Sequence, residues 1–204
     1  MRRLLAILAT VALAQCAMIN RDAFRVGGEE DALIIIGVAK SSNDTSPRYT
    51  MLWRQVDPDG TFARLDGGKS FDAETNAADT VRVRGIPGEF EFERVRPGTY
   101  ALDSVFAVLP DGRVNYVAQG VIEGPERPAF EVRAGEAVFL GIWQMRIEGA
   151  NATARLWRLE ESDARAVVRA SNRLTGPVRV RSTHTIAVPC SPRQLNQLSS
   201  RQVC

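Results

Sequence analysis

Apolar and polar positions alternate along short segments of the chain between residues 32 and 188. Thr80–Arg84 (TVRVR) and Glu89–Val95 (EFEFERV) alternate strictly, which is typical of strands with one buried face. Ala32–Val38 (ALIIIGV) and Ala137–Ile147 (AVFLGIWQMRI) are almost continuously apolar, which indicates strands buried on both faces. Turn residues recur at intervals of about 8–12 residues. The pattern predicts a mainly β fold, an antiparallel β-sandwich of about nine or ten strands over 32–188.

One short helix is expected near the C-terminus, over about residues 161–174. Acidic residues lie at its start and Arg169 and Arg173 near its end, an order that matches the helix dipole. Glu161 or Ser162 can cap its first turn, and Gly176 with the following proline stops it.

Large apolar residues supply the expected core between the two sheets. The residues expected to face the opposing sheet are Phe90, Phe92, Tyr100, Phe139, Leu140, Ile142 and Trp143. The three tryptophans, Trp53, Trp143 and Trp157, lie in apolar segments. We expect them in the core rather than on a sugar-stacking platform.

The first 15 residues have the features of a secretory signal peptide. Two arginines precede an uncharged stretch, Leu4–Ala14, that is too short to span a bilayer. The sequence Leu13-Ala14-Gln15-Cys16 resembles a bacterial lipobox, although Gln15 departs from the usual Gly, Ala or Ser, and it predicts lipidation of Cys16. The alternative is cleavage after Ala14, which gives a soluble protein that begins at Gln15. If Cys16 is lipidated, residues 16–31 form a lipidated N-terminus and tether.

The three cysteines fit an exported protein. Lipidation accounts for Cys16, which leaves Cys190 and Cys204 as an even pair. An oxidising compartment permits a disulfide between them. We therefore expect residues 189–204 to form a disulfide-closed C-terminal tail.

The charge excludes some classes of partner. The formal net charge of +2 equals the contribution of Arg2 and Arg3, so the chain beyond residue 15 is formally neutral. A neutral chain argues against nucleic-acid binding. One histidine and three cysteines are too few for the common His/Cys metal sites. We expect no metal and no cofactor.

Four arginines form the candidate anion-binding set. Arg82 and Arg84, and likewise Arg179 and Arg181, alternate with valine, so each pair lies on one face of its strand. Such faces can bind lipid phosphates or an anionic glycan through bidentate contacts. The alternative is a solvated sheet face whose arginines pair with acids on neighbouring strands.

No catalytic residue is assigned. His184 is the single histidine, and neither G-x-S-x-G nor S-x-x-K occurs in the chain. Asp57, Asp59 and Asp111 fit turn sequences better than a pair of glycosidase acids. We expect a protein that is not an enzyme.

Two segments carry a family resemblance. Phe92–Tyr100 (FERVRPGTY) resembles the F-x-x-V-x-P-G-x-Y segment of transthyretin-like or carboxypeptidase-regulatory-like sandwich domains. Phe130–Gly141 (FEVRAGEAVFLG) is similar to a segment common in uncharacterised bacterial envelope lipoproteins with such domains. The resemblance implies a β-sandwich and export, and it carries no catalytic residue onto this chain.

The first hypothesis is a non-enzymatic cell-envelope lipoprotein that acts as a binding or structural module. Its lipid holds it to the membrane, and the expected location is the outer membrane, facing the periplasm. Its partner is an envelope protein or an anionic glycan or lipid. The alternatives are a soluble periplasmic or secreted ligand-binding protein, and a hydrolase whose site the sequence does not reveal.

Overall fold

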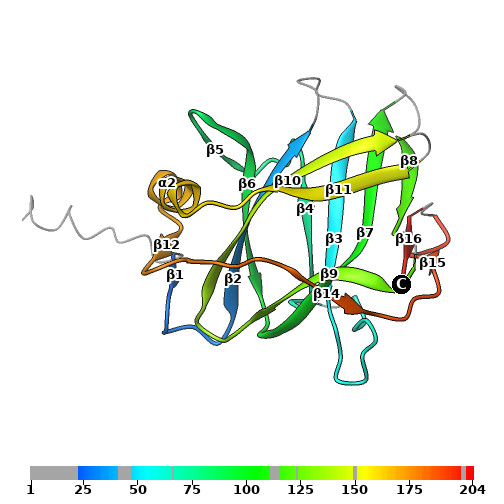
Figure 1. The fold of residues 1–204 in the computed structure, drawn as a ribbon, viewed down its shortest axis with the longest axis horizontal. Helices are drawn as coiled ribbons and strands as arrows, with labels where there is room; N and C mark the ends of the chain where they lie inside the picture. Colours follow the sequence, from blue (N-terminus) through cyan, green and yellow to red (C-terminus); the bar gives the residue numbers. More distant parts are fainter. Residues whose placement is uncertain are drawn as a thin grey trace, which may run out of the picture.

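The computed structural model describes residues 23–40, 47–65, 67–110, 115–122, 124–148, 151–198 and 201–204. Two six-stranded sheets form most of the fold, and one helix lies against the outer face of the first sheet (Figure 1). The predicted mainly β, sandwich-like fold with one short helix is therefore confirmed.

The first sheet, here the helix-side sheet, mixes parallel and antiparallel pairs. Its strand order is β11 (Asn151–Arg158), β10 (Ala137–Glu148), β2 (Ala32–Lys40), β6 (Ile86–Val95) and β5 (Val81–Val83), and β13 (Arg179–Val180) also pairs with β10. The β2–β10 and β10–β13 pairs are parallel. The prediction of a purely antiparallel sandwich is wrong at these two pairs.

The second sheet, here the tail-side sheet, is antiparallel. Its strand order is β14 (His184–Ala187), β9 (Glu126–Val132), β7 (Gly98–Pro110), β3 (Arg48–Gln55) and β4 (Ser70–Glu74), and β8 (Asn115–Val121) also pairs with β7.

Both faces of the central strands β2 and β10 of the helix-side sheet are buried, as their apolar runs predicted. Ile34 and Ile36 of β2 belong to the core between the two sheets, whereas Leu33 and Ile35 belong to a second core under the helix. All four side chains are at most 3% exposed. This second core requires a third layer, which the helix supplies.

The second core corrects part of the predicted packing. Leu140, Trp143 and Tyr100 lie in the core between the sheets, as expected. The residues that instead belong to the second core, or pack against it, are Phe90, Phe92, Phe139 and Ile142. The sequence pattern does not distinguish the two faces of a strand that is buried on both.

A β-bulge in β11, opposite Ile142 and Trp143 of β10, decides the position of Trp157. Gly141 has a φ of 80°, and a Cβ there would lie 2.5 Å from the carbonyl oxygen of Arg158. The register shifts between Ile142 and Trp143, so that Trp157 of the edge strand β11 has no pairing partner. Its side chain is 48% exposed. The core prediction is correct for the other two tryptophans and wrong for Trp157.

The helix α2 (Glu161–Ser171) is shorter than predicted. Asn172, with a left-handed φ of 54°, ends it before Gly176 is reached. Glu160 occupies the N-cap position without a side-chain cap hydrogen bond, so the expected capping by Glu161 or Ser162 is wrong. Asp163 is buried in the first turn, and its Oδ2 lies 2.6 Å from Nε of Arg158 on β11. This ion pair fixes the helix to the sheet.

The packed fold begins earlier than the predicted tether allows. The strand β1 (Phe24–Arg25) pairs in parallel with β12 (Leu174–Thr175), and Phe24 is 1% exposed. Residues 23–31 therefore belong to the folded domain and not to a tether. The predicted signal peptide over 1–15, Cys16 and the rest of the predicted tether lie outside the described residues.

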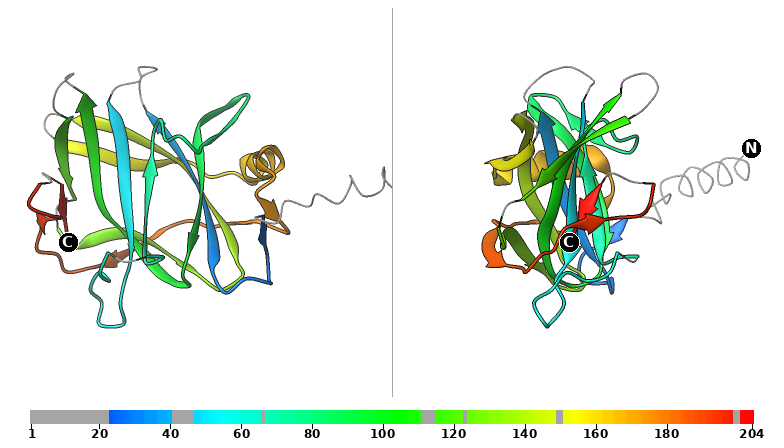
Figure 2. Two further views of the ribbon diagram at one scale, coloured as in Figure 1. Left: turned by 180° about the vertical axis from the view of Figure 1, so that it is seen from behind. Right: turned by 90° about the vertical axis from the view of Figure 1, so that its right-hand side faces the viewer.

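The C-terminal tail carries the predicted disulfide between Cys190 and Cys204. The short strands β15 (Arg193–Gln194) and β16 (Gln202–Val203) pair within it. The tail lies at the opposite end of the molecule from β1, β12 and α2 (Figures 1 and 2).

Candidate functional site

The structure does not bring the four predicted arginines together. Arg82 lies on the edge strand β5 and Arg84 directly follows it, whereas Arg179 lies on β13. The strands β6, β2 and β10 separate these two positions in the sheet. The anion-binding set therefore consists of two separate pairs.

Three of the four arginines are held by carboxylates. Arg82 Nη2 lies 2.5 Å from Oε1 of Glu89, and Arg181 Nη2 lies 2.5 Å from Oε1 of Glu136. The same Glu136 oxygen is 3.6 Å from Nη1 of Arg179. The side chain of Arg179 is 72% exposed, so its guanidinium group is more accessible to a ligand than that of Arg181.

Arg179 lines a cleft between α2 and β13 with a volume of about 380 Å³. The apolar part of the lining comes from Ala164, which is fully buried, and from the partly buried Val178 and Val180. The volume is in the range of small-molecule sites, about 300–1,000 Å³.

The rim of this cleft is charged. Arg165 is 60% exposed and pairs with Glu161 one helical turn earlier, at 3.0 Å. Arg179 lines the cleft from β13, so one guanidinium comes from each element. An exposed ion pair of this kind is worth only about 0.2–1 kcal/mol, and an incoming anion can displace it. The cleft thus combines an apolar lining with two guanidinium groups whose carboxylate partners can be displaced by an anionic ligand.

A row of carboxylates on β6 faces the free edge of β4. Oε1 of Glu91 accepts a hydrogen bond from the backbone N–H of Glu74 at 2.5 Å. Oε2 of Glu89 accepts one from the N–H of Asn76, also at 2.5 Å. These bonds join β6 of the helix-side sheet to the edge strand β4 and the turn after it, through side chains instead of a strand ladder.

Burial raises the pKa of two carboxyl groups in this row. The pKa of Glu91 is raised to about 8, mainly because the side chain is 6% exposed; neighbouring carboxylates raise it further, and the N–H of Glu74 lowers it. The pKa of Glu93 is raised to about 7 by burial and by Asp72 and Asp79, against the opposing charge of Arg173. Both carboxyl groups therefore titrate near neutral pH.

The remaining sequence candidates in the described part of the chain do not line the cleft. His184 is exposed on the edge strand β14, where it pairs with Ala129. Trp157 lies on β11. Asp57 and Asp59 lie in the turn after β3, and Asp59 accepts hydrogen bonds from the backbone and side chain of Thr61. Asp111 lies outside the described residues.

Sequence reasoning missed a buried ion pair on the tail-side sheet. Nη1 of Arg54 lies 2.9 Å from Oδ2 of Asp103, and both side chains are at most 2% exposed. The sequence contained a signal for this ion pair. Arg54 is the single charged residue of the largely apolar segment YTMLWRQV, and Asp103 is the single charged residue of YALDSVFAVL. Charges in such positions are buried as pairs.

Comparisons with protein families, with curated proteins and with solved structures found no match to this chain.

The described residues contain no helix that is long and apolar enough to cross a membrane. Nor do these residues include a group of three or more His, Cys, Asp or Glu side chains placed to hold a metal ion.

Proposed function

We propose that this protein is a non-enzymatic envelope lipoprotein whose α2–β13 cleft binds the anionic headgroup of a membrane lipid. The observation that carries the proposal is the position of the cleft. One wall of the cleft is α2, and this helix lies at the same end of the molecule as β1, the first strand in the described part of the chain (Figure 1).

The length of the N-terminal segment supports this orientation. Residues 17–22 separate Cys16 from Ala23. Even fully extended, the seven residue steps from Cys16 to Ala23 span only about 25 Å. A lipid on Cys16 therefore keeps the α2 end near the membrane, and the disulfide-closed tail points away from it.

The chemistry of the cleft suits a phospholipid. Arginine binds phosphate oxygens through paired N–H donors, and Arg165 and Arg179 supply them from two elements. The buried methyl of Ala164 and the two valines suit the glycerol and first acyl carbons. The disulfide between Cys190 and Cys204 is compatible with an oxidising compartment such as the periplasm.

Replacement of Cys16 by alanine is expected to release the protein from the membrane fraction. The cleft alone is too weak an anchor, whereas several acyl chains hold a protein stably. The measurement is membrane fractionation after a high-salt wash. The control is Cys190→Ser/Cys204→Ser, which removes the other two cysteines and leaves the N-terminus intact. Retention of the Cys16→Ala protein in washed membranes contradicts lipid anchoring.

The cleft is tested with the exported Cys16→Ala protein and vesicles of phosphatidylcholine with and without phosphatidylglycerol. We expect binding only to the anionic vesicles, and a loss of about fivefold in affinity for Arg165→Gln or Arg179→Gln, because one arginine near an anionic surface contributes about 1 kcal/mol.

The matched control for the cleft is Arg193→Gln. Arg193 is an exposed arginine on β15, at the far end of the molecule (Figure 1). Its replacement removes the same charge and is expected to leave vesicle binding unchanged. An equal loss in all three variants shows attraction by overall charge and contradicts a specific cleft.

A further inference from the structure

The disulfide-closed tail covers part of the outer face of the tail-side sheet. The backbone N–H of Cys204 donates to Oδ1 of Asp103 on β7 at 3.0 Å. Nη2 of Arg201 lies 2.9 Å from Oδ1 of Asp72 on β4, and its guanidinium group lies over the ring of Phe106, 4.3 Å from the centroid. The tail therefore shields Asp103 and Phe106 from water, and both side chains are at most 7% exposed.

Few contacts other than the disulfide hold the tail in place. Of its described residues, 189–198 and 201–204, only Val203 is buried. Leu195 is 37% exposed and Leu198 is fully exposed. The core between the two sheets includes no described residue of the tail. Opening of the disulfide is therefore expected to release the tail and to leave the sandwich folded.

The chain is fixed to the sheet just before the tail begins. Val188 is fully buried in a small cluster with Ala101 and Ala129, and its N–H donates to the carbonyl oxygen of Pro125 at 2.8 Å. These contacts do not depend on the disulfide. A released tail therefore remains attached at Val188 and can return when the disulfide forms again.

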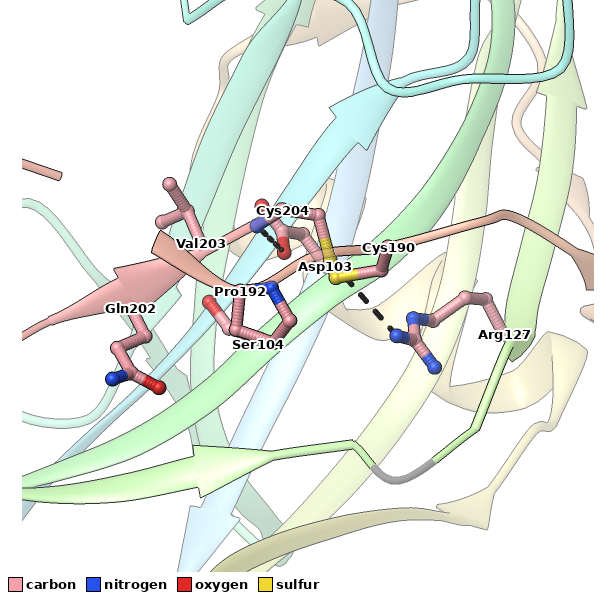
Figure 3. A pocket seen from close by; sticks show the side chains of 8 residues that line it. All are labelled: Asp103, Ser104, Arg127, Cys190, Pro192, Gln202, Val203 and Cys204. Carbon is pink, nitrogen blue, oxygen red and sulfur yellow. Dashed lines mark hydrogen bonds between the residues drawn. A yellow bond between two sulfur atoms is a disulfide. The ribbon is translucent and has the colours of Figure 1, made fainter. Parts of the chain in front are cut away.

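A buried arginine distinguishes the two sulfur atoms of the disulfide. Nη2 of Arg127 lies 3.9 Å from Sγ of Cys204 (Figure 3), and among the described residues Sγ of Cys190 makes no such contact. The carboxylate of Asp103 lines the same space, but it already pairs with Nη1 of Arg54 at 2.9 Å. Burial lowers the pKa of Arg127, and the charge of Asp103 opposes this shift only in part. A negative charge that forms on Cys204 is therefore stabilised by Arg127.

We propose that the Cys190–Cys204 disulfide is a redox-controlled latch, which a dithiol opens by thiol–disulfide exchange. A thiolate of the dithiol attacks Sγ of Cys190, the bond between the two cysteine sulfurs breaks, and Cys204 leaves as a thiolate beside Arg127. The second thiolate of the reagent then attacks the reagent sulfur bonded to Cys190. The dithiol is oxidised to a disulfide, two electrons reduce the protein, and the two protons of the dithiol end on the two cysteines. Both cysteines are partly exposed, so the reagent can reach them.

The direction of attack is tested with glutathione, a monothiol that forms the mixed disulfide. The test uses the Cys16→Ala protein, in which only Cys190 and Cys204 remain. After a short reaction the free thiol is blocked with N-ethylmaleimide. Trypsin then separates the two cysteines, because Arg193 and Arg201 lie between them. Mass spectrometry is expected to find glutathione on Cys190 in roughly threefold excess over Cys204, because the better stabilised thiolate leaves faster.

Variants of Arg127 test the cause of this preference. In Arg127→Met the two products are expected in nearly equal amounts, whereas Arg127→Lys keeps the positive charge and keeps the excess on Cys190. Arg133→Met, at a 78% exposed arginine, is the matched control and keeps the wild-type ratio. A role of Arg127 in stability alone does not change which cysteine carries the glutathione.

Release of the tail is measured by hydrogen exchange before and after reduction with dithiothreitol. The amides of β15, β16 and Cys204 are expected to lose protection on reduction, whereas those of β3 and β7 keep it. Cys190→Ser/Cys204→Ser is expected to show the same open tail without a reductant. Unchanged protection of the tail after reduction, loss of protection throughout both sheets, or equal labelling of the two cysteines in the Cys16→Ala protein overturns the proposal.

Discussion

Replacing Trp143 by alanine lowers the free energy of unfolding by about 3–5 kcal/mol, the usual cost of truncating a buried tryptophan. Trp143 is 2% exposed, and its ring lies edge-to-face against Trp53 with centroids 5.3 Å apart. Its Nε1 donates to the carbonyl oxygen of Leu140 at 3.0 Å. Truncation therefore leaves a cavity between the sheets and an unpaired carbonyl group. Urea melts followed by circular dichroism measure the change.

The matched control is Trp157→Ala, since this tryptophan lies on the neighbouring strand β11 and is half exposed. Its replacement is expected to change the stability by no more than about 0.5 kcal/mol. Trp143→Phe, which keeps most of the ring, is expected to fall between the two and to remain folded. An unchanged urea midpoint for Trp143→Ala contradicts the core assignment.

The free energy of unfolding is expected to fall by about 4 kcal/mol through Glu91 as the pH rises from 5 to 9. The pKa of Glu91 is about 8 in the folded protein against an ordinary value of 4.5. The folded state therefore holds a proton that the unfolded chain has released, and stability declines through this window. Each unit of difference corresponds to about 1.4 kcal/mol. Glu93, with a pKa of about 7, adds in the same direction.

Glu91→Gln isolates this effect. The amide oxygen still accepts the N–H of Glu74, but the side chain no longer ionises. We expect a flatter dependence of stability on pH, and a variant at least as stable as the wild type at pH 9. Glu131→Gln, at a carboxylate that is 56% exposed, is the control and keeps the wild-type slope. If Glu91→Gln keeps the same slope, ionisation of Glu91 does not contribute to it.

The candidate site could be predicted only in part. Arg179 was identified from its alternation with valine, and it lines the cleft. Arg165 could not be identified from the sequence, because i to i+4 spacing shows which residues share a face of a helix but not what lies opposite that face. The cleft exists because α2 packs beside β13, and that contact is not a local property of either segment.

Several features of the fold were already determined by the sequence. The apolar runs of β2 and β10 predicted burial on both faces, because such strands have no alternation to give one face to water. The count and position of the cysteines predicted the disulfide of Cys190 with Cys204. Both inferences depend on composition within a short segment, or on the pairing of a few reactive groups.

Only the tertiary structure decided which neighbouring layer packs against each face of a strand. In β6, Phe90 packs under α2 whereas Glu91 reaches β4, the reverse of the orientation that we expected for Phe90. Alternation separates two faces but does not say which neighbour covers each one. The pairing of Arg54 with Asp103 joins positions far apart in sequence. Contacts of this kind depend on which strands become neighbours, and that choice is made by the packing of the whole domain.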